Sequence, residues 1–116
     1  MNWNESNTLI HQNIRVGTDL NPNSQFRKVV EVYNRDNTTY FRVQIGTSNS
    51  ILITMSMLEI LYMASIQNGG IYNHNVFKSY YPKQINNHPC HVHVVGKIFQ
   101  LSGVMTQRDR RNYQIQ

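Results

Sequence analysis

The spacing of apolar residues changes near residue 54, and this change constrains the fold more than any other feature of the chain. Residues 28–33 (KVVEVY) and 39–45 (TYFRVQI) are rich in β-branched and aromatic side chains, and residues 34–37 (NRDN) between them are typical of a turn. The second run alternates polar and apolar side chains, which indicates one solvated face and one packed face. We therefore expect an antiparallel hairpin, with residues 50–53 as a candidate third strand.

From Thr54 onward the apolar residues recur at spacings of three and four, which is the helical period. Thr54 is a suitable N-cap for a helix over residues 55–67. Asn73 can cap a shorter helix over residues 75–80. We expect this helix to end before Pro82, because proline disfavours helical angles in the residue that precedes it.

The predicted function depends on whether residues 88–102 form a helix or a strand. At the helical period the apolar side chains of this segment form one broad arc, and a polar set lies opposite. The arc consists of Val92, Val94, Val95, Ile98, Phe99 and Leu101, and the opposite set of His93, Gly96, Lys97 and Gln100. A strand is the alternative, because residues 91–94 alternate in polarity and valine favours strands. We expect a helix, because the alternation breaks at residues 95–97.

Two short strand-like pieces, residues 104–106 and 113–115, flank a turn over residues 107–112. They predict a hairpin whose tip carries Arg108, Arg110 and Arg111. The net charge of the chain is +5, and residues 78–116 hold six lysines and arginines against one aspartate. Positive charge gathered in one part of a chain attracts polyanions, so nucleic acid is the expected partner.

The order of elements from residue 54 resembles the winged helix-turn-helix family: a helix, a turn, a short helix, an amphipathic helix and a basic hairpin. The resemblance implies that the third helix enters the major groove of DNA and that the hairpin, or wing, follows the backbone or the minor groove. It directs one set of side chains toward bases or phosphates, namely His93, Lys97 and Gln100. It directs a second set toward the neighbouring groove, namely Arg108, Arg110 and Arg111.

The expected fold class is α+β, with a small N-terminal antiparallel β-hairpin or sheet packed against a C-terminal winged helix-turn-helix. Residues 1–25 are expected to form a flexible or irregular arm. Residues 26–53 would form the hairpin or sheet, and residues 54–116 the winged-helix-like module, the two making one compact unit.

The chemistry of the third helix agrees with binding to double-stranded DNA. Glutamine can make two hydrogen bonds to adenine, lysine can contact guanine, and Gly96 would let the DNA backbone approach closely. The helix has one lysine and no arginine, so we expect phosphate contacts and DNA shape to outweigh direct recognition of bases. The expected role is that of a non-catalytic regulator or accessory of a mobile element or defence system. The alternative is that both polar sets are ordinary solvated surface.

Two other functions remain open. The chain could be a protein-interaction module, such as a small phage-type inhibitor that docks its basic face on an acidic partner. It could also bind single-stranded nucleic acid, with Tyr40 and Arg42 of the hairpin stacking on bases. The sequence does not fix the oligomeric state, and a homodimer is one option.

Metal binding and catalysis find little support in the sequence. Residues 88–93 (HPCHVH) and His74 invite a zinc interpretation, but zinc takes four ligands and a second ligand pair is missing. Cys90 lacks an orienting acid, so we expect neither an enzyme nor a cofactor. The single cysteine fits a reducing compartment. No apolar run approaches the roughly 18 residues of a membrane span, so the expected location is the cytoplasm without membrane contact.

Overall fold

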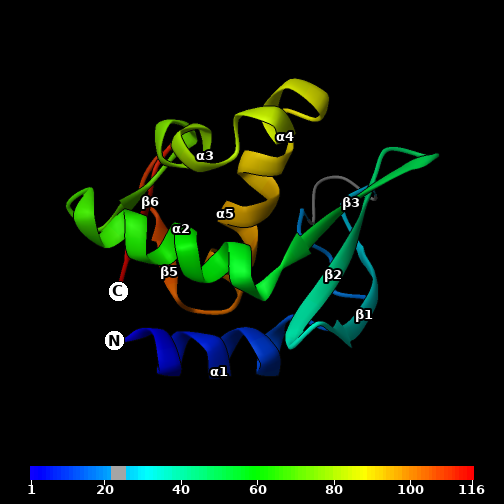
Figure 1. Cartoon of the computed structure of the whole chain (residues 1–116), viewed down its shortest axis with the longest axis horizontal. Coiled ribbons are helices and arrows are strands. Elements are labelled where there is room, and N and C mark those ends of the chain that lie inside the picture. Colours follow the sequence, from blue (N-terminus) through cyan, green and yellow to red (C-terminus); the bar gives the residue numbers. More distant parts are fainter. Residues whose placement is uncertain (22–25) are drawn as a thin grey trace.

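The computed structural model describes residues 1–21 and 26–116. In chain order the described elements are α1 (Trp3–Asn13), β1 (Val29–Arg35), β2 (Thr38–Ile45), β3 (Asn49–Thr54), α2 (Met55–Gln67), β4 (Ile71–Tyr72), α3 (His74–Tyr80), α4 (Pro82–Asn87), α5 (His91–Leu101), β5 (Met105–Gln107) and β6 (Tyr113–Ile115). They form an α+β fold with two antiparallel three-stranded sheets, ordered β1–β2–β3 and β4–β6–β5. Helix α2 packs between α1 and α3, and the first sheet lies to one side of the helices (Figure 1).

Helix α1 occupies residues that the sequence predicted to be irregular, so a helix precedes the first sheet. Ile10 of α1 is completely buried, and the ring of Trp3 lies 5.6 Å from the ring of Tyr62 on α2. The expectation of an arm is wrong for residues 3–13, because their amphipathic pattern is weak and packing against the core stabilises the helix instead. Residues 22–25 of the expected arm lie outside the described residues.

The first sheet confirms the predicted hairpin and its third strand. Asp36 and Asn37 connect β1 to β2 with φ angles of 54° and 63°, as a two-residue hairpin turn requires. Strand β2 alternates buried and half-buried residues, so one of its faces packs inside. Thr54 ends β3 and caps α2, because its Oγ1 accepts a hydrogen bond from the Met57 N–H at 3.0 Å. The sheet therefore passes directly into α2.

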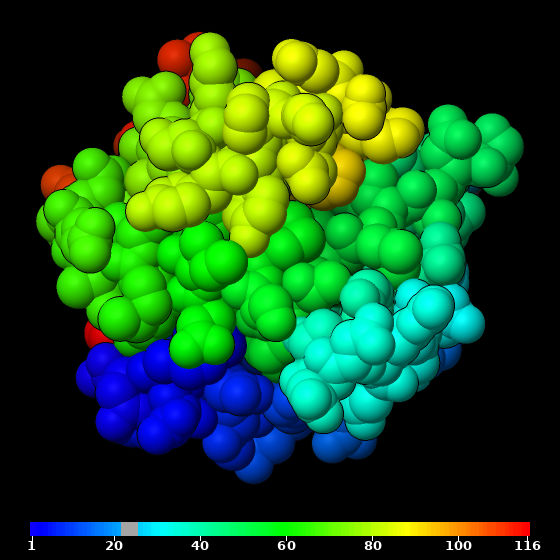
Figure 2. All heavy atoms as spheres, viewed as in Figure 1, coloured from blue at the N-terminus to red at the C-terminus, as the bar shows by residue number. Residues whose placement is uncertain are grey.

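Helix α2 has the predicted bounds but is apolar on both sides. Its inner side buries Leu58, Leu61 and Tyr62. Its outer side leaves Ile60, Met63 and Ile66 between 43% and 49% exposed. In Figure 2 the α2 surface is framed by α1, the β1–β2 turn and α3. Among the helices of the described ranges, none has both the length and the apolar content to cross a bilayer.

The helices after α2 follow the predicted order, with one addition. Asn73 caps α3 as expected, and Tyr81 leaves helical angles before Pro82. The chain then begins α4 with Pro82 at the first position, where the missing N–H has no consequence. Helix α5 confirms that the segment expected over residues 88–102 is helical, although the helix begins only at His91.

The second sheet contains the predicted hairpin and a strand that the sequence did not reveal. Strands β5 and β6 pair antiparallel, and β6 also pairs with the two-residue β4. Opposite one another on β4 and β6 lie Tyr72 and Tyr113, both fully buried. The Tyr72 hydroxyl donates to the Val92 carbonyl of α5 at 2.7 Å, which joins this sheet to α5.

Candidate nucleic-acid interface

Helix α5 is buried over most of its surface. Its buried residues are His91, Val92, Val94, Val95, Gly96, Ile98 and Phe99. His93 is exposed, while Lys97 and Gln100 are half-buried. The predicted polar edge therefore reaches solvent, but as a narrow stripe. Leu101, expected on the buried arc, is 40% exposed.

Gly96 lies under the ring of Tyr113 and not on the solvent edge. A Cβ atom on Gly96 would lie 2.5 Å from Cζ and 2.9 Å from Cδ1 of that ring. The expectation that Gly96 lets DNA approach is therefore wrong, because β6 occupies the space above it. The glycine is needed for packing of the hairpin on α5.

The ammonium group of Lys97 is held across two elements. Its Nζ donates to Oε1 of Gln100 on α5 and to Oε1 of Gln107 on β5, both at 3.0 Å. Both acceptors are neutral amides, so these two contacts position the lysine without pairing it with a carboxylate. The same bond orients the Gln100 amide, whose oxygen already has one donor.

The arginines of the wing surround an ordered turn. Arg108, Arg110 and Arg111 are all exposed. Oδ1 of Asp109 accepts hydrogen bonds from the backbone N–H of Arg111 at 2.8 Å and of Asn112 at 3.0 Å. The Arg111 N–H is the main reason that the pKa of Asp109 lies below its ordinary value. The one acidic residue of the turn is thus engaged with backbone donors.

Two open cavities have His93 among their lining residues. The larger, about 490 Å³, lies between the start of α3, the wing turn and α5, and its walls include His74, His93 and Arg111. The smaller, about 180 Å³, includes His93, Lys97 and Arg27. The structure thus brings three of the predicted residues together around the cavities, whereas Arg108 and Arg110 line neither of these two.

The sequence did not predict Arg27 as a site residue, and it raised His74 only for a zinc site that lacked a second ligand pair. Arg27 precedes β1, far from α5 along the chain, so no local spacing could have placed it beside Lys97. His74 directly follows the Asn73 cap and is the first residue of α3. The predicted cap therefore placed His74 at the start of that helix.

The ring of His93 is in a cationic environment. Partial burial of the ring lowers the pKa of His93, and the charge of Lys97 and the neighbouring His74 lower it further. His93 therefore favours the neutral imidazole until a negative group approaches. An anion bound beside it would favour the charged form.

His91, the other histidine of α5, is turned inward. Its Nδ1 lies 2.9 Å from the His88 carbonyl oxygen, and its ring packs near Phe77. Since a carbonyl only accepts, Nδ1 carries the proton. Within residues 1–21 and 26–116, no three His, Cys, Asp or Glu side chains gather in a group that could hold a metal ion.

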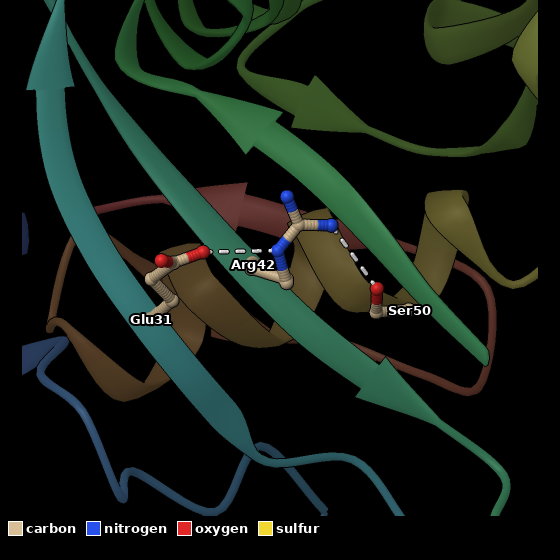
Figure 3. A network of polar contacts seen from close by, with 3 residues as sticks. All are labelled: Glu31, Arg42 and Ser50. Carbon is tan, nitrogen blue, oxygen red and sulfur yellow. Dashed lines mark hydrogen bonds and ion pairs between the residues drawn. The ribbon is translucent and has the colours of Figure 1, made fainter. Parts of the chain in front are cut away.

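The exposed face of the first sheet is engaged in contacts of its own (Figure 3). Nε of Arg42 donates to Oε1 of Glu31 at 3.0 Å, and Nη1 donates to Oγ of Ser50 at 3.2 Å. The ring of Tyr40 stacks on that of Tyr33, with centroids 5.1 Å apart and an interplanar angle of 5°. Both side chains expected to stack on bases therefore already have partners within the sheet.

Comparison with known proteins adds no assignment. No protein-family model, no curated protein and no solved structure matches the chain. The candidate interface therefore stands on its geometry and charge.

Proposed function

We propose that the protein binds double-stranded DNA, without catalysing a reaction, through the solvent side of α5 and the wing. We call this surface the cationic face, and it consists of His93, Lys97, Gln100, Arg108, Arg110 and Arg111. The observation that carries the proposal is where the ion pairs lie. In the described part of the chain the two ion pairs are Arg35–Asp36 and Arg42–Glu31, both in the first sheet. Among the described residues no carboxylate forms an ion pair with Lys97 or the wing arginines, so their charges can act on phosphates.

The arrangement of elements supports the winged-helix interpretation. From α2 onward the order is helix, strand, two short helices, α5 and a hairpin, and the second strand of the hairpin pairs with β4. Because α5 presents only a narrow stripe, we expect His93 and Lys97 to contact phosphates and to read few bases. The wing arginines would lie against the adjoining backbone or minor groove. The setting we propose is regulation, or an accessory role in a mobile element or defence system, in the cytoplasm.

The test is binding to a duplex of random sequence over a range of salt concentrations. We expect a steep linear fall of log K with log salt concentration, because bound phosphates release counterions. Replacing Arg108, Arg110 and Arg111 together with glutamine should reduce the slope by about 2.7, since each contacted phosphate contributes about 0.9. The matched control removes three cations outside the face, Arg15, Arg35 and Lys83, and should leave the slope nearly unchanged. An equal change in both triple variants would argue against the wing as part of the interface.

A second candidate is an acidic protein that docks on the same face. The observation that favours it is that α5 is buried over most of its surface and that His93 and Lys97 line cavities. An acidic surface loop fits such a recess more easily than a rigid duplex does. A poly-glutamate peptide that binds more tightly than the duplex at equal salt, and depends on the wing arginines, would favour this candidate.

A further inference from the structure

The larger cavity beside His93 has the composition of a phosphate site. Three basic side chains line it from three elements: His74 from α3, His93 from α5 and Arg111 from the wing turn. None of its described lining residues is acidic. Its volume of about 490 Å³ exceeds that of a phosphate alone, which leaves room for the sugars on either side of a backbone phosphate.

The walls of this cavity are fixed to one another before any ligand binds. Asn73 uses both ends of its amide: Oδ1 accepts from the Val76 N–H and caps α3, and Nδ2 donates to Oδ1 of Asn112, each at 3.1 Å. Asn112 is in turn held by Asp109, whose Oδ1 accepts from its Nδ2 at 3.0 Å. The start of α3 and the wing turn are therefore joined, which sets the positions from which His74 and Arg111 reach the cavity.

We propose that this cavity binds one phosphate group, and that protonation of His93 strengthens the binding as the pH falls. The inference rests on the proposed binding of duplex DNA, since its occupant is a phosphate of the DNA backbone. Arg111 supplies a charge at every pH near neutrality, and the imidazole of His93 supplies a charge that depends on pH.

The surroundings of His93 support this coupling between binding and pH. The charged or titratable groups that face His93 across the two cavities are His74, Lys97, Arg111, Arg27 and Tyr113. None of them is acidic, so nothing in this set stabilises an imidazolium until an anion enters. Burial and the cations lower the pKa of free His93, and a bound phosphate would raise it. Binding therefore takes up protons, and the affinity must rise as the pH falls.

The experiment measures duplex affinity at pH 7.5, 6.5 and 5.8 and constant ionic strength. For each histidine whose pKa rises by one unit on binding, we expect the affinity to gain up to about tenfold. The variant His74→Gln/His93→Gln should lose the gain in affinity between the highest and the lowest pH. His11→Gln removes an exposed histidine from α1 and should keep the full gain. If the double variant keeps the gain, the inference is overturned.

A second measurement separates this inference from the proposed function. Histidine side-chain resonances are followed by NMR while inorganic phosphate, and then a nucleoside monophosphate, is added to the whole chain. Duplex binding without dependence on the two histidines would overturn the phosphate site and leave the proposed function standing. Absence of duplex binding, together with a raised pKa of His93 in phosphate, would overturn the proposed function and assign the cavity to a free phosphate. No response to any of these probes would overturn both.

Arg111 offers an independent check. Arg111→Gln should weaken duplex binding at every pH and keep the pH dependence, because the arginine stays charged throughout. The matched control is Arg35→Gln on the β1–β2 turn, which removes the same charge outside the cavity. Equal weakening by the two variants would show a general effect of net charge and would contradict the assignment of Arg111 to the cavity.

Discussion

Gly96 of α5 and Tyr113 of β6 are in contact, with the tyrosine ring occupying the volume where any larger residue would place its Cβ. Both residues are buried, and the Tyr113 ring centroid lies 6.0 Å from that of Tyr72 on β4. The contact fixes the distance between α5 and the strand that supports the wing. The position of the wing arginines relative to the polar residues of α5 therefore depends on glycine at residue 96.

We expect Gly96→Ala to destabilise the protein by about 1–3 kcal/mol, the usual effect of overpacking a core. The helix itself would favour alanine by up to about 1 kcal/mol, so a net loss would show that the clash dominates. Thermal or urea unfolding measures the change. The double variant Gly96→Ala/Tyr113→Ala should lose less than the sum of the single changes, because the methyl group then enters the space left by the ring. Additive losses would contradict the contact.

We expect the protein to lose stability as the pH falls below about 6.5, the ordinary pKa of histidine. Burial is the main cause that lowers the pKa of His91, so the unfolded chain binds the proton more readily than the folded one. The stabilisation is complete above the unfolded-state pKa and is lost as the pH falls through the lower folded-state pKa. Melting temperatures between pH 7.5 and 5 measure this loss. His91→Gln should flatten the profile, and His11→Gln should not.

We expect Asn73→Ala and Thr54→Ala to cost similar stability, about 1 kcal/mol each, because each removes one helix cap. Only Asn73 also holds the wing turn, through Asn112. Duplex affinity should therefore fall in Asn73→Ala and remain near the parent value in Thr54→Ala. Urea unfolding and duplex titration, performed on the same two variants, separate the loss of stability from the loss of binding. Equal duplex affinities in the two variants would contradict the inference that Asn73 positions the wing turn.

We expect Ile10→Ala to destabilise the whole protein by about 2–5 kcal/mol, because it opens a cavity at a fully buried position. His11→Ala changes the neighbouring exposed residue and should have an effect below about 0.5 kcal/mol. Unfolding followed by circular dichroism measures both. A small effect of Ile10→Ala would mean that α1 is dispensable for the fold.

The spacing of hydrophobic residues predicted the helices and strands with long, regular patterns. It missed the elements that depend on contacts between distant parts of the sequence. The hairpin turn at Asp36-Asn37 and the caps at Thr54 and Asn73 were predictable because their chemistry is local. Helix α1 was not, because its stability depends on Ile10 packing in the core. Strand β4 has two residues, too few for any period, and exists because β6 pairs with it.

The sequence predicted only those site residues that lie together on one helix or one hairpin. The stripe of His93, Lys97 and Gln100 follows from helical spacing, and in the structure His93 is exposed while Lys97 and Gln100 are partly exposed. Helical spacing also placed Gly96 on that stripe, although Tyr113 of β6 covers it in the structure. The spacing of residues along one helix cannot show that a strand packs over it. The cavity shared with His74 joins residues of different elements, which only the tertiary fold brings together.

The order of strands implies that the first sheet can form earlier during folding than the second. The first sheet, β1–β2–β3, pairs only sequence neighbours, so each strand meets its partner across a short turn. In the second sheet the middle strand, β6, comes after both of its neighbours in the chain. Strand β4 is therefore unpaired until residues 113–115 have been synthesised, and the wing forms only after the first sheet has had the opportunity to fold.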